Sequence, residues 1–137
     1  MTRYERLQKL NADEFKRAMG VQIKTFKLML KLLREAQKEK MNRGGRPCLL
    51  SIEDHLIMSL KYLRDYPTFF QLGLEFGVSE TSAWRACVWV EDVLIKSKAF
   101  SLPGKSKLLN SNEENVLIDV TECAIERPKK KLKMAAR

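Results

Sequence analysis

Asp119 is the residue whose surroundings most clearly suggest chemistry. It interrupts an apolar run, Leu117-Ile118-Asp119-Val120, inside the segment NVLIDVT. This segment is rich in β-branched residues and is the only convincing strand in the sequence. Burying a carboxylate on such a strand costs free energy unless the carboxylate is paired or binds a metal ion. The sequence therefore raises the question of what compensates Asp119.

A second set of residues that could bind a ligand lies near the start of a helix predicted for residues 80–96. Arginine can bind guanine with two hydrogen bonds, serine and threonine can contact bases or phosphates, and a helix N-terminus favours a phosphate. Such a set is suited to duplex DNA. Its outward members are expected to be Thr81, Ser82 and Arg85, with Trp84 and Trp89 at the flanks.

Other kinds of site find little support in the sequence. His55 is the only histidine, which excludes His-based triads and mixed Cys/His metal sites. The three cysteines, Cys48, Cys87 and Cys123, match no zinc spacing, and their odd number argues against a disulfide framework. Packing or surface positions are the simplest interpretation of all four residues.

Residues 68–95 follow the order of a helix-turn-helix. Thr68 and Gln71 form a capping box that opens the short helix FFQLGLEF, and Ser79 caps the longer helix after it. Between them, Gly77 supplies the positive φ that this turn commonly needs, and Val78 is expected to pack between the helices. A three-helix packing unit with no role in DNA binding remains the alternative.

The elements that must position this motif are also predicted to be helical. The sequence predicts a short helix ADEFKRAM, a longer one over about 22–40, and a third that begins after Ser51 and ends before Tyr66-Pro67. The segment NRGGRP (42–47) ends the second of these and forms a flexible basic linker. The expected inward residues are Ile23, Phe26, Leu30 and Leu33 on the second helix, Ile52, Leu56, Leu60 and Leu63 on the third, and Ala83, Ala86, Cys87, Val90 and Leu94 on helix 80–96.

Charge is distributed unevenly along the 137 residues, whose formal net charge is +9. Residues 1–47 carry 13 Lys/Arg and five Asp/Glu, whereas residues 48–126 carry seven and 12. Basic segments favour nucleic acids through counterion release, although solvated helix faces would have a similar composition. Because the helix-turn-helix block is acidic, phosphate contacts are expected mainly from Arg43, Arg46 and the N-terminal lysines. With no signal peptide or membrane-spanning run, a cytoplasmic location and no membrane partner are expected.

Several blocks together resemble a known family. The segment GRPCLLSIEDHLIMSLKYLRDYPTFFQLGLEFGVSETSAWRACVWVEDVL is similar to the N-terminal helix-turn-helix of DDE-type bacterial transposases of the insertion sequence five family. MGVQIKTFKLML looks like the leading helical pair of that family, LPGK like its connector, and IDVTECAIERPKKK like the start of its catalytic domain. The resemblance covers about residues 11–131.

The resemblance implies that Asp119 corresponds to the first carboxylate of the DDE triad, on the first strand of a ribonuclease-H-like domain. In the complete family enzyme, three carboxylates hold two Mg²⁺ ions for phosphoryl transfer. The second aspartate and the glutamate are not found in these 137 residues, so the expectation is a truncated transposase that is not an enzyme alone. Asp119 would be a magnesium ligand only with the rest of the domain, and this chain by itself would need no cofactor.

The expected fold is mainly α: a helical pair with a basic linker (1–47), a helix-turn-helix unit of three helices (48–100), and a connector with a short stranded remnant of the catalytic domain (101–137). The expected function is binding of transposon terminal inverted repeats, with the chain itself or a full-length transposase as a possible further partner. Two alternatives remain: the upstream frame of a frameshifted transposase, or a helical protein-interaction module. The DNA-binding set comprises Ser79, Thr81, Ser82, Trp84, Arg85, Arg43 and Arg46.

Overall fold

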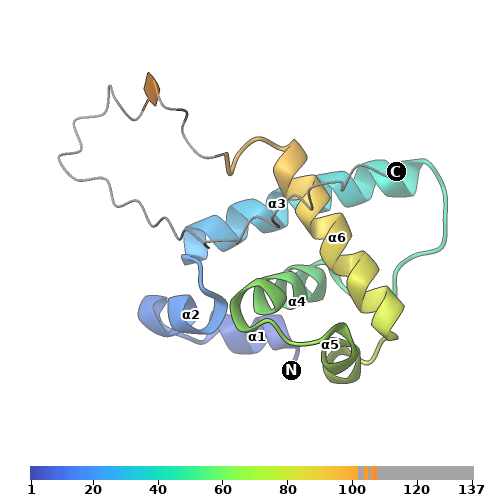
Figure 1. Cartoon of the computed structure of the whole chain (residues 1–137), viewed down its shortest axis with the longest axis horizontal. Coiled ribbons are helices and arrows are strands. Elements are labelled where there is room, and N and C mark those ends of the chain that lie inside the picture. The colour runs from blue at the N-terminus through green and yellow to red at the C-terminus, as the bar shows by residue number, and fades with distance from the viewer. Residues whose placement is uncertain (102–103, 105, 108–137) are drawn as a thin grey trace, which may run out of the picture. The chain divides into compact units, whose positions relative to one another are not determined.

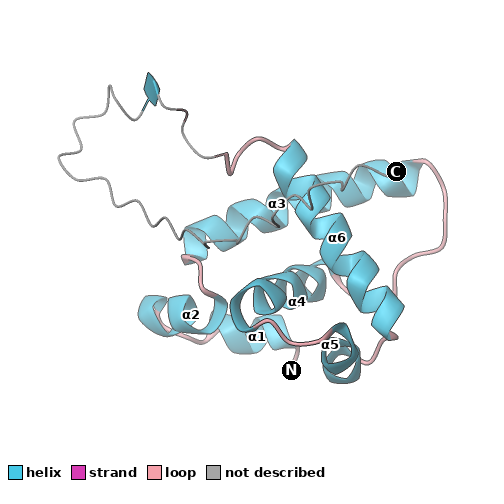
Figure 2. Ribbon diagram, viewed as in Figure 1, coloured by secondary structure: helices cyan, strands magenta, loops and turns pink. Residues whose placement is uncertain are grey.

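The protein is mainly helical in the part of the chain that the structure describes. This computed structural model describes residues 1–101, 104, 106 and 107, of which residues 1–101 belong to one compact unit. The predicted strand around Asp119 lies outside the described residues. Figures 1 and 2 show the helices, which are α1 (Arg3–Gln8), α2 (Ala12–Met19), α3 (Ile23–Asn42), α4 (Ile52–Asp65), α5 (Phe69–Phe76) and α6 (Glu80–Lys96).

The hydrophobic core is organised around α4, which contacts each of the other five helices. Leu56 and Met58 of α4 are fully buried, as are Leu33 of α3, Leu72 of α5 and Ala83 of α6. Burying such side chains contributes about 1.5–3 kcal/mol each for the larger ones, so these contacts fix the packing of α5 and α6 on α4. The helix-turn-helix segment therefore rests on a core to which α3 also contributes.

Capping residues define most helix boundaries, as the sequence predicts. Asn11 and Thr68 each form a capping box, with Glu14 and Gln71 respectively. The side chain of Ser51 accepts a hydrogen bond from the backbone N–H of Asp54 at the start of α4. Each cap satisfies an N–H that the helix leaves unpaired. The helix ends predicted at Gly20 and before Tyr66 are confirmed, and both cap residues adopt the left-handed conformation.

The helix α1 is an element that the sequence interpretation did not include. Its signal is nevertheless local: Thr2 and Glu5 form a capping box like those of α2 and α5. Tyr4 of α1 stacks on Phe26 of α3 at 6.0 Å between ring centroids. The Arg3 guanidinium lies 4.2 Å from the centre of the Phe76 ring, which ties α1 to α5.

One of the predicted inward positions, Leu63, is wrong. Leu63, expected on the buried face of α4, is 51% exposed in the last turn of that helix. Ile23, at the first position of α3, is partly buried and packs against the core. Phe26, Leu30 and Leu33 are buried as predicted. None of the helices in the described residues is both long and apolar enough to cross a membrane.

An ion pair between α3 and α4 leads to a pH-dependent prediction. Arg34 Nη2 donates to Glu53 Oε1 at 2.6 Å. Partial burial would raise the pKa of the Glu53 carboxyl, but hydrogen bonds and the charge of Arg34 outweigh it and hold this pKa below its ordinary value. A lowered pKa in the folded state stabilises the fold above the unfolded pKa, and this stabilisation is lost as pH falls through the folded value.

We therefore expect Glu53→Gln to lower the free energy of unfolding by about 0.5 kcal/mol at neutral pH, the usual scale for an exposed pair. The difference from wild type should become smaller at about pH 3, below the ordinary pKa of glutamate, because the stabilisation is lost as pH falls through the lowered folded pKa of Glu53. Urea denaturation at the two pH values measures both quantities. A difference that stays constant between them would show that the charge of Glu53 is not responsible.

Candidate nucleic-acid interface

The turn between α5 and α6 is held by a close backbone approach. Gly77 ends α5 with φ +72°, and its N–H donates to the carbonyl of Gly73. The N–H of Val78 donates to the same carbonyl at 2.9 Å. A Cβ on Gly73 would lie 2.6 Å from the carbonyl oxygen of Val78, a distance that real Cβ atoms do not show. Gly73 therefore allows the end of α5 to meet the start of α6.

The sequence interpretation identified Gly77 in this turn but missed Gly73. The available signal was an isolated glycine inside an otherwise helical pattern, which often marks a packing requirement. Val78 is partly buried and packs against the core, as predicted for the apolar residue of the turn.

Ser79 begins α6 as its N-cap. Its Oγ accepts a hydrogen bond from the backbone N–H of Ser82 at 3.2 Å and donates to Ser82 Oγ at 2.9 Å. A hydroxyl has one donor and two acceptor positions, so Ser79 is largely occupied by capping. Ser82 still has its own O–H to donate outward. Of these two predicted DNA-binding serines, Ser82 is the better placed to contact a ligand.

The helix α6 has a clear inner and outer face. Ala83, Ala86, Cys87 and Val90 are buried, and burial raises the pKa of the Cys87 thiol, which keeps it protonated. Leu94 is only partly buried. The outer side of the N-terminal half consists of exposed side chains: Thr81, Ser82, Trp84 and Arg85, with Trp84 50% exposed.

Trp89 does not lie at the flank of this outer surface, where it was expected. Its ring meets the buried His55 edge-to-face at 5.5 Å, and the Lys40 ammonium lies 5.7 Å from the ring centre. Trp89 is thus a packing residue that joins α6 to α4 and α3. Helical spacing placed it near the outer side, but the end of α3 covers it.

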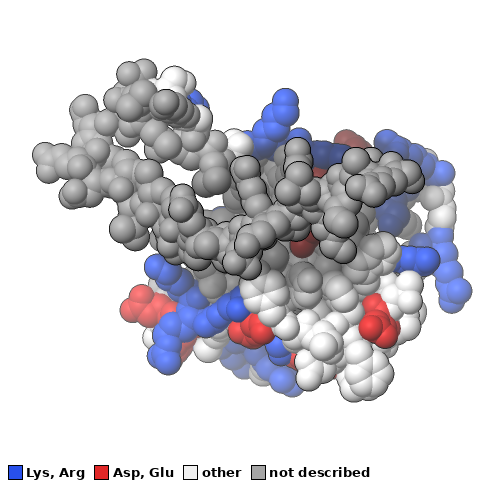
Figure 3. Space-filling view, viewed as in Figure 1, with Lys and Arg blue, Asp and Glu red and all other residues white. Residues whose placement is uncertain are grey.

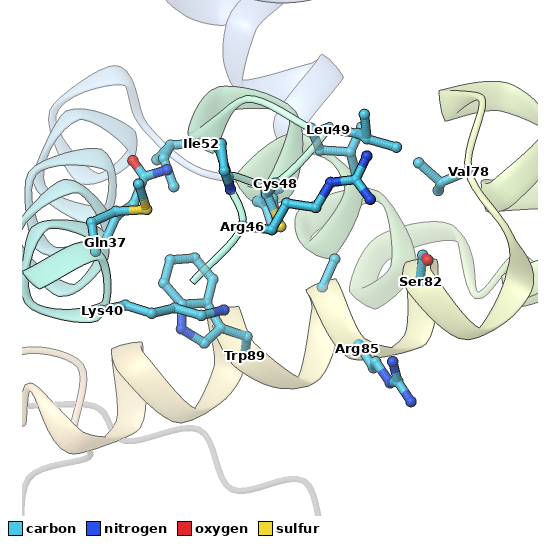
Figure 4. A pocket seen from close by; sticks show the side chains of 15 residues that line it. Gln37, Lys40, Arg46, Cys48, Leu49, Ile52, Val78, Ser82, Arg85 and Trp89 are labelled. Carbon is cyan, nitrogen blue, oxygen red and sulfur yellow. The ribbon is translucent and has the colours of Figure 1, made fainter. Parts of the chain in front are cut away.

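A groove of about 600 Å³ separates the end of α3 and the following linker from α6 (Figure 4). Its buried or partly buried lining is mostly apolar and includes Ile52, Ala86 and Trp89, with Gln37 and His55 as polar members. Three exposed cations also line it: Lys40, Arg46 and Arg85. The groove therefore brings Arg46, Ser82 and Arg85 of the predicted set together, and it adds Lys40, which the sequence interpretation did not single out.

The remaining members of the predicted set lie elsewhere. Thr81 and Trp84 are exposed on α6 but do not line the groove, and Arg43 is exposed at the end of α3. Asp119 lies outside the described residues. Within the described part of the chain, no group of three or more His, Cys, Asp or Glu side chains could hold a metal ion.

Comparisons with known proteins agree with this geometry. A protein of Microchaete diplosiphon, described as "Probable transposase for insertion sequence element IS702", is 44% identical over 131 residues. The match covers 94% of this chain and 47% of that relative, so the chain spans about half the length of the relative. No solved structure matches the chain. The family described as "Helix-turn-helix of DDE superfamily endonuclease" matches residues 47–99, which include α4, α5 and α6. Residues 47–99 are therefore similar to the helix-turn-helix of DDE superfamily endonucleases.

Proposed function

We propose that this chain binds duplex DNA at the ends of a mobile element, with the N-terminal half of α6 in the major groove. The observation that carries the proposal is the exposed polar start of α6 inside a segment that matches a helix-turn-helix family. In this motif the first residues of the second helix contact base edges. The relative named as a probable transposase supports the choice of element ends as the target.

The side chains have distinct expected roles. Arg85 is suited to a guanine, to which it can donate two hydrogen bonds, while Ser82 and Thr81 can contact bases or the adjacent phosphates. Lys40 and Arg46, across the groove from Arg85, are placed to contact the sugar–phosphate backbone. Phosphate contacts position the protein without reading sequence, so specificity should depend mainly on α6.

Catalysis is a separate matter from DNA binding. By the family resemblance, strand cleavage needs three carboxylates and two metal ions. By that resemblance Asp119 would correspond to the first of these carboxylates, and we propose that the helix-turn-helix segment binds DNA while cleavage depends on the whole carboxylate set. Residues 47–99 and α6 would then supply recognition alone.

A direct test uses duplexes that tile the DNA on both sides of the coding region. We expect one of them to bind about a thousandfold more tightly than a shuffled duplex of equal composition at physiological salt, as is typical of specific sites. Fluorescence anisotropy titration measures both affinities. If every duplex binds like its shuffled control, the chain does not recognise the ends of its element.

A second candidate function is protein binding through α5. Phe70 and Leu74, one helical turn apart, are 59% and 70% exposed and so place two large apolar side chains together on the surface of α5. A contact here with another copy, or with a full-length transposase, would be compatible with DNA binding by α6. In the same titration, Leu74→Ser should leave affinity for DNA unchanged if α5 serves only protein contacts.

A further inference from the structure

The segment Arg43–Pro47, called here the arginine arm, joins α3 to the helix-turn-helix domain. All five residues are exposed, and they form no helix. Gly44 and Gly45 have φ values of +86° and +132°, and a Cβ added to either would meet no atom within 4 Å. Pro47 restricts Arg46 to extended conformations. The arm is therefore a thin, exposed piece of chain whose first two residues close the turn that ends α3, where the N–H groups of Arg43 and Gly44 donate to the carbonyls of Lys40 and Met41.

The two arginines of the arm differ from those that serve the fold. Arg3 pairs with Asp54 at 3.5 Å, and Arg34 pairs with Glu53 at 2.6 Å. Within residues 1–101, neither Arg43 nor Arg46 forms an ion pair or a side-chain hydrogen bond. No acidic residue lies in the arm itself. Both guanidinium groups are thus available to a ligand without breaking a contact of the fold.

The position of the arm relates it to α6. In Figure 1 the linker after α3 runs along the side of the domain where α6 begins, and Figure 3 shows basic side chains on that side, at the right of the view. Arg46 lines the same groove as Ser82 and Arg85 (Figure 4). Arg43 is three residues further from the domain, a reach of up to about 10 Å in extended chain.

That reach matches the geometry of DNA. The major and minor grooves are separated by a single sugar–phosphate backbone, and the minor groove is only about 6 Å wide. With α6 in the major groove and Arg46 beside it, an arm of this length can cross one backbone. The two glycines between the arginines have no side chains to obstruct entry into a narrow groove.

We propose that the arginine arm enters the minor groove next to the α6 site and selects A·T base pairs there. This inference rests on the proposed DNA-binding function and deepens it. A·T-rich segments have a narrow minor groove with enhanced negative potential, which attracts inserted arginines. Guanine places an amino group in that groove, so a G·C pair obstructs an inserted guanidinium.

The test changes the chemical groups in the minor groove of the DNA and leaves those in the major groove unchanged. A duplex is first selected from a randomised pool by the wild-type chain. Diaminopurine is then substituted for adenine beside the α6 site, which adds an amino group to the minor groove and keeps the major-groove pattern. We expect wild-type affinity to fall by about tenfold, the scale of one wrong base pair. The Arg43→Ala, Arg46→Ala double variant should lose less than about threefold.

A matched control separates arginine insertion from charge. The Arg43→Lys, Arg46→Lys double variant keeps both charges, and we expect it to bind a shuffled duplex as wild type does but to lose most of the diaminopurine effect. Arginine is less strongly hydrated than lysine and is the residue that enters narrow minor grooves. A lysine variant with the full effect would overturn the role of arginine. Circular dichroism melting checks that all variants fold.

The outcomes also separate this inference from the proposed function. If the chain binds the selected duplex tightly and diaminopurine does not weaken that binding, the minor-groove role of the arginine arm is overturned and the DNA-binding function remains. Failure of the pool to yield any duplex that binds better than random DNA would overturn both.

Discussion

Replacing Gly73 with alanine is expected to destabilise the domain by about 2–3 kcal/mol, the upper range for forcing extra atoms into a packed site. The added Cβ would lie 2.6 Å from the Val78 carbonyl oxygen and 3.3 Å from the Glu80 nitrogen. These are backbone atoms of the turn, which cannot move aside as a flexible side chain could. The overlap between the added Cβ and these backbone atoms can be relieved only if α5 and α6 move apart.

The direction of the change in stability distinguishes two opposing effects of Gly73→Ala. Alanine in place of glycine inside a helix ordinarily stabilises by about 0.5–1 kcal/mol. Helix propensity and close packing thus predict opposite results for Gly73→Ala. Urea denaturation followed by circular dichroism decides between them, and a variant more stable than wild type would contradict the turn geometry described here.

Gly77→Asn is the matched control. Gly77 has φ +72°, but a Cβ there would meet no atom within 4 Å. Asparagine adopts the left-handed conformation more readily than other residues with side chains, so the cost should stay below about 1 kcal/mol. A large loss for Gly73→Ala beside a small one for Gly77→Asn would place the constraint at the contact between the helices.

Replacing Arg85 with alanine is expected to weaken binding to the selected duplex by about 10- to 100-fold, equivalent to the roughly 1–3 kcal/mol of a bidentate contact with guanine. Affinity for a shuffled duplex should change by less than about threefold, because one charge contributes little to nonspecific binding. Arg85 is exposed and has no resolved ion pair within residues 1–101, so the fold should not depend on it.

Arg17→Ala is the control for charge. Arg17 is an exposed residue of α2 and does not line the groove. Its removal lowers the net charge by the same amount as removal of Arg85, and we expect small and equal effects on both duplexes. If the two variants lose the same affinity for the selected duplex, Arg85 acts through charge alone and does not read a base.

Local signals explain which parts of the fold could be predicted. The caps at Asn11, Ser51, Thr68 and Ser79 depend on residues three positions apart, and the helix boundaries that they define are confirmed. The same signal at Thr2 predicts α1 and was overlooked. Periodicity identified the buried residues of α6 and, in α3, Phe26, Leu30 and Leu33 but not Met29, because a helix that packs on one core repeats its apolar side.

Contacts between distant segments could not be predicted in this way. Trp89 has the spacing of a flanking residue, but its neighbours are His55 and Lys40, 34 and 49 positions earlier in the chain. The groove that unites Arg46 with Arg85 likewise depends on how α3 and the linker pass α6. The close contact at Gly73 requires the path of the turn, which the residue pattern alone does not determine.

In the proposed complex, the first turns of α6 lie in the major groove with Arg85 at a guanine. Methylation interference probes this contact, because methylation at guanine N7 blocks a major-groove acceptor. We predict that methylation of one guanine in the selected duplex abolishes binding by the wild type. The Arg85→Ala variant should bind the duplex equally well with and without methylation at that guanine. Equal interference in wild type and Arg85→Ala, or no interference at any guanine, would contradict this placement of α6.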